Sequence, residues 1–357
     1  MIIINPIKIL PREEALDRGL PFVKKCLDGI LMKKIDIKGR ILNPKISVVI
    51  PCYNCKKYIK SALRSVQNQN MADIEIIIQN DGSKIETVNY LNELKKEDPR
   101  IEIYNNEKNM KLFYTRSSGV LKARGKYLVT LDSDDFFLDA DVFDTLYMAA
   151  EDGNFDIIAF RVFMGPENLR RDQISDNRYN FKEHNLKIYQ PELSCYMLLD
   201  KLNDLNIWGK LYRTYVYKSA VNILGKERIS LPIEWEEDRI MLITIMNIAS
   251  SYKFIGKYGY YYRGHGGSSS NRLNENTKIY STLFKVDIDL DFAKKECANY
   301  PAKYLIRKHK YFKKAKDNKS KFYLRKVIRK ALYSDRINDT YKNEIKNLYG
   351  NYLPNEI

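Results

Sequence analysis

Strand-like and helix-like segments alternate over residues 46–131, and this alternation constrains the fold of the chain more than any other feature. The strand-like segments are short and rich in β-branched residues, whereas the segments between them carry apolar residues at helical spacing. The expected strands cover 46–50, 74–78, 101–104 and 127–131, and the expected helices cover 58–66, 88–95 and 114–123. This order predicts an α/β fold with a mostly parallel, Rossmann-like central sheet flanked by helices.

Three polar segments follow the expected strands directly. They are Pro51–Asn54, Asn80–Ser83 and Asp132–Asp135. Open α/β sheets bind their ligands beyond the carboxyl ends of the strands. We therefore expect these three segments to form one binding crevice.

The third segment holds a cluster of acids, Asp132, Asp134 and Asp135, immediately after the strand ending at Leu131. Crowded carboxylates repel one another unless a cation compensates, and oxygen ligands favour Mg²⁺ or Mn²⁺. Such an ion commonly completes its shell with substrate phosphates. The alternative is that these acids cap the next helix, which is the role expected of Asp139 and Asp141.

Several other motifs are absent or incomplete. Neither a P-loop nor a G-x-G-x-x-G loop follows the first strand, which disfavours a P-loop NTPase and an NAD-type Rossmann enzyme. The series Asp287, Asp289 and Asp291 resembles the start of a calcium loop, but Phe292 stands where that loop needs glycine. We expect no calcium site there.

The five cysteines predict no disulfide framework, because they are few, scattered and odd in number. Cys52 and Cys55 also lack a second pair of ligands at zinc spacing. We therefore expect unpaired cysteines and a reducing, cytoplasmic compartment. Neither a signal peptide nor a membrane-spanning segment is expected from the apolar pattern.

The net charge of +16 is concentrated in one region, because residues 301–330 contain 13 Lys or Arg and a single acid, Asp317. Apolar residues recur there at helical spacing, which predicts basic helices. Three interpretations remain open: a solvated helix packed on the rest of the protein, peripheral contact with an anionic membrane, or nucleic-acid binding. Nucleic acid is the least favoured partner because the remainder of the chain is nearly neutral.

Three strings in order resemble the family 2 glycosyltransferases of the GT-A fold. They are Ile46–Asn54, Asn80–Ser83 and Leu131–Asp135, and the later segments Trp208–Arg213, Glu237-Asp238 and Tyr260–Arg263 with Ser268–Ser270 are similar to the acceptor-side signature of many members. The resemblance covers about residues 46–270. We therefore expect a GT-A domain over 45–270, with donor-binding and acceptor halves divided at residue 150. The apolar spacing in the flanking segments predicts an N-terminal helical preamble (1–44) and a basic helical extension (271–357).

The resemblance implies a nucleotide-sugar donor and a divalent metal ion, Mn²⁺ or Mg²⁺. The implied donor-binding residues are Pro51, Tyr53, Asn54, Asp81, Arg116, Asp132 and Ser133, with Asp134 and Asp132 at the metal. A plain turn is the alternative for Asp81. Lys111 and Ser117 depart from the family pattern, in which glycine and asparagine are common at these positions.

Asp238 is the candidate catalytic base, since it is expected in the first turn of a buried helix. The alternative is that Asp238 and the preceding acids only complement the helix dipole. Residues expected on the acceptor or phosphate side are Trp208, Lys210, Glu237, Arg263 and His265.

The expected activity is metal-dependent, inverting transfer of a hexosyl or N-acetylhexosaminyl group. The donor would be a nucleotide-sugar, with UDP the nucleotide suggested by family frequency, and the acceptor a hydroxyl of a glycan or a lipid-linked molecule. Two alternatives belong to other classes: a catalytically inactive GT-A protein that acts as a binding or scaffold module, and a nucleic-acid-binding protein that uses residues 301–330.

Overall fold

The computed structural model describes residues 43–167, 186–190, 192–198, 206–264, 273–293 and 297–352. Several expectations fall outside these ranges: the helical preamble up to residue 42, His265 and Ser268–Ser270. The division of the chain at residues 44 and 270 stays a prediction.

A mixed sheet of nine strands forms the centre of the fold, in the order β3-β2-β1-β4-β8-β6-β9-β5, with β7 paired to β9. Strands β3, β2, β1 and β4 run parallel, as the sequence predicts. The strands are β1 (Ile46–Cys52), β2 (Ile74–Asn80), β3 (Ile101–Asn105), β4 (Tyr127–Thr130), β5 (Phe136–Phe137), β6 (Ile157–Pro166), β7 (Lys187–Tyr189), β8 (Lys210–Arg213) and β9 (Ser251–Gly264).

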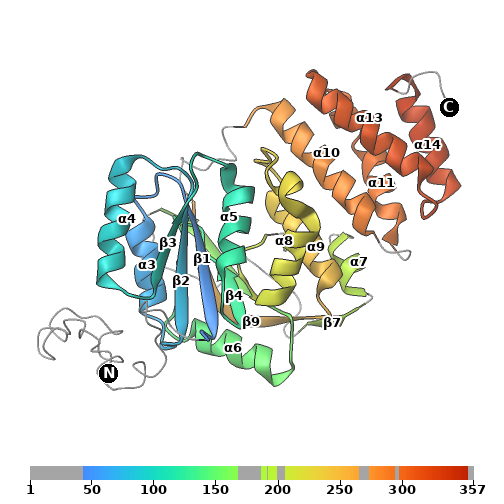
Figure 1. The fold of residues 1–357 in the computed structure, drawn as a ribbon. Helices are drawn as coiled ribbons and strands as arrows, with labels where there is room; N and C mark the ends of the chain where they lie inside the picture. The colour runs from blue at the N-terminus through green and yellow to red at the C-terminus, as the bar shows by residue number, and fades with distance from the viewer. Residues whose placement is uncertain are drawn as a thin grey trace, which may run out of the picture.

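Helices cover both faces of the parallel strands (Figure 1). In β1, Val48 and Ile50 face a core shared with α3, α4 and α6, whereas Val49 faces the core shared with α5, α8 and α9. These helices are α3 (Ile59–Gln67), α4 (Ile85–Glu97), α5 (Lys111–Lys122), α6 (Val142–Asp152), α8 (Thr214–Ile229) and α9 (Glu237–Ile248). Burial on both faces explains why β1 is continuously apolar.

The C-terminal region is helical, as expected, and has an apolar core of its own. Its helices are α10 (Glu275–Phe292), α11 (Asn299–Arg307), α12 (His309–Phe312), α13 (Asn318–Tyr333) and α14 (Asp339–Tyr349), and a short helix, α7 (Glu192–Leu198), precedes β8. Figure 1 shows α10 between α13 and the sheet. None of the helices in the described ranges combines the length and apolar character that crossing a membrane requires.

The expectation of unpaired cysteines was wrong. Disulfides join Cys52 to Cys55 in the turn after β1, and Cys195 on α7 to Cys297 just before α11. The second pair spans 102 residues, so sequence spacing gives no sign of it. The compartment, which was inferred from unpaired cysteines, stays a prediction.

The series Asp287, Asp289 and Asp291 lies within helix α10 and not in a loop. Asp287 pairs with Lys326 and Lys330 of α13, and Asp289 pairs with Lys285. Asp287 therefore ties α10 to α13, whereas the pair of Asp289 with Lys285 lies within α10.

Candidate active site

One arginine contacts two carboxylates that lie far apart in the sequence. The Nη1 atom of Arg116 lies 2.6 Å from Asp238 Oδ1, and its Nη2 atom lies 2.9 Å from Asp132 Oδ1. Arg116 is on α5, Asp132 follows β4, and Asp238 is in the first turn of α9. Three separate elements thus converge beyond the end of β4, where the sequence predicts the crevice.

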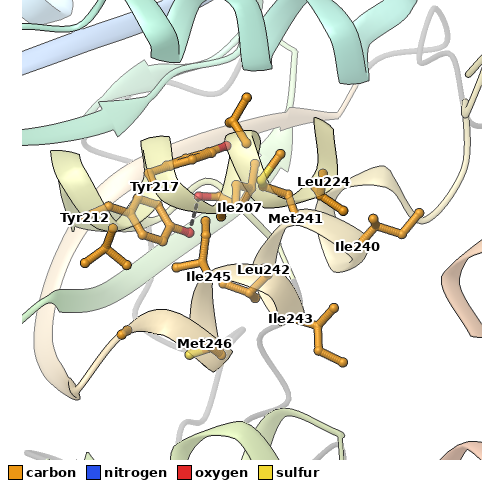
Figure 2. Close-up of a cluster of buried hydrophobic side chains, with 14 of the residues drawn as sticks. Ile207, Tyr212, Tyr217, Leu224, Ile240, Met241, Leu242, Ile243, Ile245 and Met246 are labelled. Atoms are coloured by element: carbon orange, nitrogen blue, oxygen red, sulfur yellow. Dashed lines mark hydrogen bonds between the residues drawn. The ribbon is translucent and has the colours of Figure 1, made fainter. Parts of the chain in front are cut away.

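Packing beneath α9 fixes the position of Asp238. Residues 240–246 of this helix are all buried, and Figure 2 shows Ile240, Met241 and Ile245 in one apolar cluster with Tyr217 and Leu224 of α8. The hydroxyl of Tyr212 donates to the carbonyl of Ile207 at 2.8 Å in the same cluster. Because the core holds the helix, its first turn presents Asp238 to Arg116.

Burial governs the ionisation of the two acids that begin α9. It raises the pKa of Asp238, Arg116 opposes this shift, and the negative charge of Asp132 adds to it. Burial and the charge of Asp238 raise the pKa of Glu237 to about 8, with Arg116 acting in the opposite direction. Arg116 therefore favours the ionised form of both acids.

The acids after β4 occupy different environments. Asp135 is buried and accepts hydrogen bonds from the Tyr260 hydroxyl at 2.7 Å and the Arg263 backbone N–H at 2.8 Å. Burial, followed by the charges of Asp132 and Asp134, raises its pKa to about 8. Asp132 and Asp134 are half-buried. Asp135 therefore supports the loop, while Asp132 and Asp134 lie nearer to solvent.

The residues present fit a divalent ion of the Mg²⁺ or Mn²⁺ type. In the described ranges no three His, Cys, Asp or Glu side chains gather closely enough to hold a metal by themselves. These ions commonly use only one or two protein carboxylates together with substrate phosphates and water. Asp132 and Asp134 provide such oxygens, and their negative charges add to the effect of burial in raising the pKa of Asp135.

The helix-capping role expected of Asp139 and Asp141 was only partly right. Asp141 occupies the N-cap position of α6, but its side chain makes no capping hydrogen bond. Both acids instead contact the ammonium group of Lys257. They therefore connect α6 to β9 and take no part in the crevice.

Asp81 organises the turn after β2. Its Oδ1 accepts from the Asn106 side chain and the Met110 backbone, and its Oδ2 accepts from the Lys111 backbone at 3.0 Å. The next residue, Gly82, has φ +65°, and a Cβ there would lie 2.6 Å from the Lys108 backbone. Asp81 is buried, and its carboxylate joins the turn after β2 to the segment between β3 and α5. Its contact with a base stays a prediction.

The turn after β1 is joined to the turn after β2. The backbone N–H of Asn54 donates to Ser83 Oγ, and Asn54 Oδ1 accepts from the Lys84 N–H. Tyr53 lies between the two bonded cysteines in the sequence, and 54% of its surface is exposed. Pro51 is buried at the end of β1, so the exposed Tyr53 and Asn54 are the residues of this group that offer a surface to a ligand.

The residues expected on the acceptor or phosphate side differ in burial. Trp208 is buried and stacks on Tyr260, with ring centroids 5.6 Å apart. Lys210 is fully buried, and its Nζ donates to the Asn206 carbonyl at 2.6 Å, which directs the ammonium away from any solvent-facing ligand. The guanidinium of Arg263 lies over the ring of Tyr58 at 5.0 Å.

Sequence reasoning missed a link between the two halves of the site. Lys111 Nζ pairs with Glu234 Oε2 at 3.1 Å, which connects the start of α5 to the segment before α9. Lys111 has φ 72°, a conformation that favours glycine. The departure from the family's glycine at this position was the signal that could have identified it.

Comparison with known proteins agrees with this geometry. Residues 47–199 match the family model described as "Glycosyl transferase family 2". Over this segment the chain has the sequence pattern of a family 2 glycosyltransferase. The matched segment contains Asp81, Arg116 and the acids after β4.

Two bacterial proteins illustrate the extent of the similarity. EpsH of Bacillus subtilis (strain 168) is 28% identical over 240 residues, which cover 65% of this chain and 64% of EpsH. Glycosyltransferase GlyA of Streptococcus pneumoniae serotype 4 is 26% identical over 243 residues, or 66% of this chain and 33% of GlyA. The matched region thus spans less than two thirds of either relative.

The fold of the glycosyltransferase domain resembles that of a solved enzyme structure. Residues 1–349 of S. aureus TarS, solved in complex with UDP-GlcNAc, superpose with a TM-score of 0.61 at 17% sequence identity. The match covers 86% of this chain and 91% of that one. The GT-A fold class predicted from the sequence is confirmed.

Proposed function

We propose that this protein transfers a sugar from a nucleotide-diphosphate donor to a hydroxyl group of a glycan or lipid-linked acceptor, with inversion at the anomeric carbon. UDP is the proposed nucleotide, by analogy with TarS, whose structure contains UDP-GlcNAc. The observation that carries the proposal is the bridge from Asp132 through Arg116 to Asp238. This bridge joins the expected donor side to the candidate base.

Asp238 is the proposed base. Its carboxylate takes the proton from the acceptor hydroxyl as the oxygen attacks the anomeric carbon, and the bond from that carbon to the diphosphate breaks. The electron pair of the broken bond leaves with the diphosphate. The raised pKa of Asp238 makes it a stronger base than an exposed aspartate, while Arg116 preserves its ionised form.

Arg116 and the acids after β4 are proposed to serve the donor. Asp134 and Asp132 would hold a Mg²⁺ or Mn²⁺ ion, which when bound stabilises negative charge on the leaving diphosphate. Asp132 would then share its charge between that ion and Arg116. Tyr53, Asn54 and Asp81 are proposed to line the base and ribose, with Ser133 beside the diphosphate.

A thermal-shift screen tests this proposal with the full chain. We expect UDP and a UDP-sugar to raise the melting temperature only when Mn²⁺ is present, because a ligand that binds the native state stabilises it. GDP and CDP serve as matched nucleotides. A rise in melting temperature that is the same for UDP, GDP and CDP and does not depend on Mn²⁺ would contradict the proposal.

An inactive GT-A binding module remains the alternative that shares this fold. Such a protein could bind the nucleotide and show the same thermal shift, but it would release no UDP. The ion pair between Arg116 and Asp238 favours the enzyme, because the guanidinium favours an ionised carboxylate in a half-buried position where α5, α9 and the end of β4 meet. Measured release of UDP from the UDP-sugar, with and without an acceptor hydroxyl, separates the two.

A further inference from the structure

Helix α13 presents an unusual stripe on the side opposite its packed face. Its buried side chains, which include Leu324, Val327, Ile328 and Ala331, belong to the C-terminal core. The opposite stripe, which we call the docking stripe, consists of Phe322, Arg325, Arg329 and Tyr333, spaced at three, four and four residues. Both aromatic residues are strongly exposed, Phe322 at 66% and Tyr333 at 71%.

The charge of this docking stripe is not neutralised by the acids of α10. Asp287 and Asp291 pair with Lys326 and Lys330, which lie on the flank of α13. Arg325 and Arg329 are exposed, and in the ranges that the structure describes no ion pair involves either of them. Helix α13 itself contains no acid.

The position of the docking stripe leaves it accessible. Figure 1 shows α13 on the outer side of α10, away from the sheet. Two aromatic side chains therefore stand in water about 16 Å apart along the helix, at 1.5 Å per residue, with two guanidinium groups between them. Aromatic rings beside basic residues are typical of helices that lie at a bilayer interface.

We propose that the docking stripe of α13 binds the surface of an anionic lipid bilayer. Arg325 and Arg329 would contact the headgroups, while Phe322 and Tyr333 would enter the interfacial region. The stripe is a convex ridge, which suits the plane of a membrane better than a groove-seeking partner. The excess of basic residues in 301–330 adds long-range attraction to the same surface.

Binding to lipid vesicles tests this proposal with the full chain and requires no enzymatic activity, so it succeeds or fails independently of the proposed function. We expect the protein to sediment with vesicles of phosphatidylcholine and phosphatidylglycerol and to remain in the supernatant with phosphatidylcholine alone. Arg325→Gln/Arg329→Gln should weaken partitioning about 30-fold, from about fivefold for each charge near the surface. Phe322→Ala/Tyr333→Ala should weaken it by about tenfold or more.

Two control pairs separate the stripe from general surface properties. Lys95→Gln/Lys96→Gln removes the same net charge from exposed positions on α4, and Met148→Ala/Ile223→Ala removes exposed apolar side chains from α6 and α8. Both controls should partition within about twofold of the wild type. All of these positions are exposed, so circular dichroism should show intact folding.

Several outcomes would overturn the proposal. Equal sedimentation with neutral and anionic vesicles would show that anionic headgroups do not drive binding. Stripe variants that bind like the controls would show that the docking stripe is not the membrane-binding surface. Salt-sensitive retention on RNA without vesicle binding would assign the basic helices to nucleic acid. A wild-type dimer that the aromatic double variant converts to a monomer would identify a self-association surface instead.

Discussion

Arg116 Nη1 lies 2.6 Å from Asp238 Oδ1, and the same guanidinium also reaches Asp132. Arg116 is almost entirely buried, so it faces both acids with little competition from water. A ligand that changes the charge at Asp132 therefore changes the field at Asp238. The donor side and the candidate base are electrostatically coupled through one side chain.

Substitution of Arg116 should displace the pH dependence of catalysis. Arg116→Gln removes a positive charge that lowers the pKa of Asp238, so the acid limb of kcat/KM should move to higher pH. Arg116→Lys keeps the charge and should move the limb less. A lower rate with an unmoved limb would show that Arg116 acts only in binding. The pH profile of UDP release provides the measurement.

Asp238→Asn should abolish turnover while donor binding persists. Loss of a general base commonly costs about 100- to 10,000-fold in kcat. Asp144→Asn is the matched control, because Asp144 is also an acid in the first turn of a helix, α6. If both variants lost activity equally, the helix-dipole interpretation of Asp238 would be favoured. The measurement pairs kcat with the thermal shift produced by UDP and Mn²⁺.

Asp134→Asn should weaken Mn²⁺-dependent binding of UDP by at least about tenfold, since it removes a proposed metal ligand. Asp139→Asn, five residues later and paired with Lys257, should bind like the wild type. The affinity can be obtained by titrating Mn²⁺ at fixed UDP in a calorimeter. Unchanged metal affinity in Asp134→Asn would place the ion elsewhere or remove it from the reaction.

Lys111 permits a test of backbone strain. Lys111→Gly and Lys111→Ala both lose the pair with Glu234, but only glycine relieves the left-handed backbone at φ 72°. Lys111→Gly should therefore be more stable than Lys111→Ala by about 1 kcal/mol.

The control for this comparison lies within α4. At the exposed helical position Lys95, glycine should be less stable than alanine by roughly 0.5–1 kcal/mol, which is the opposite sign. Chemical denaturation of the four variants measures both differences. The same order at both positions would contradict the role assigned to strain.

Glu237 should make the protein less stable as the pH rises. Its pKa is about 8 in the folded protein and ordinary in the unfolded chain, so the folded state holds the proton more tightly. Its contribution is fully present below about pH 4.5 and is lost as the pH approaches about 8. Glu237→Gln removes this titration and should flatten the fall in the free energy of unfolding across that window.

The control for Glu237 is Glu227→Gln, an exposed acid on α8, which should retain the wild-type dependence on pH. Denaturant titrations at several pH values give the comparison. An unchanged slope in Glu237→Gln would show that Glu237 is not the group that titrates.

Much of the parallel half of the fold could be read from the sequence, because buried strands and amphipathic helices have strong local patterns. The expected strands and helices over residues 46–131 all appear, with ends that differ by a few residues. Strand β8 was not expected, since Lys210–Arg213 mixes charged and apolar residues. Lys210 is buried there, and its Nζ donates to the Asn206 carbonyl, a contact that the strand pattern does not predict.

The sequence by itself determined the α/β class and the acids that follow β4, because periodicity and the ends of strands are local properties. The tertiary structure alone decided that Arg116 bridges Asp132 and Asp238, that Asp135 turns toward Tyr260 while Asp134 stays near the surface, and that Cys195 meets Cys297. Partners so distant in the chain are chosen by the packing of helices and strands on a shared core, and that packing also sets the burial that shifts each pKa.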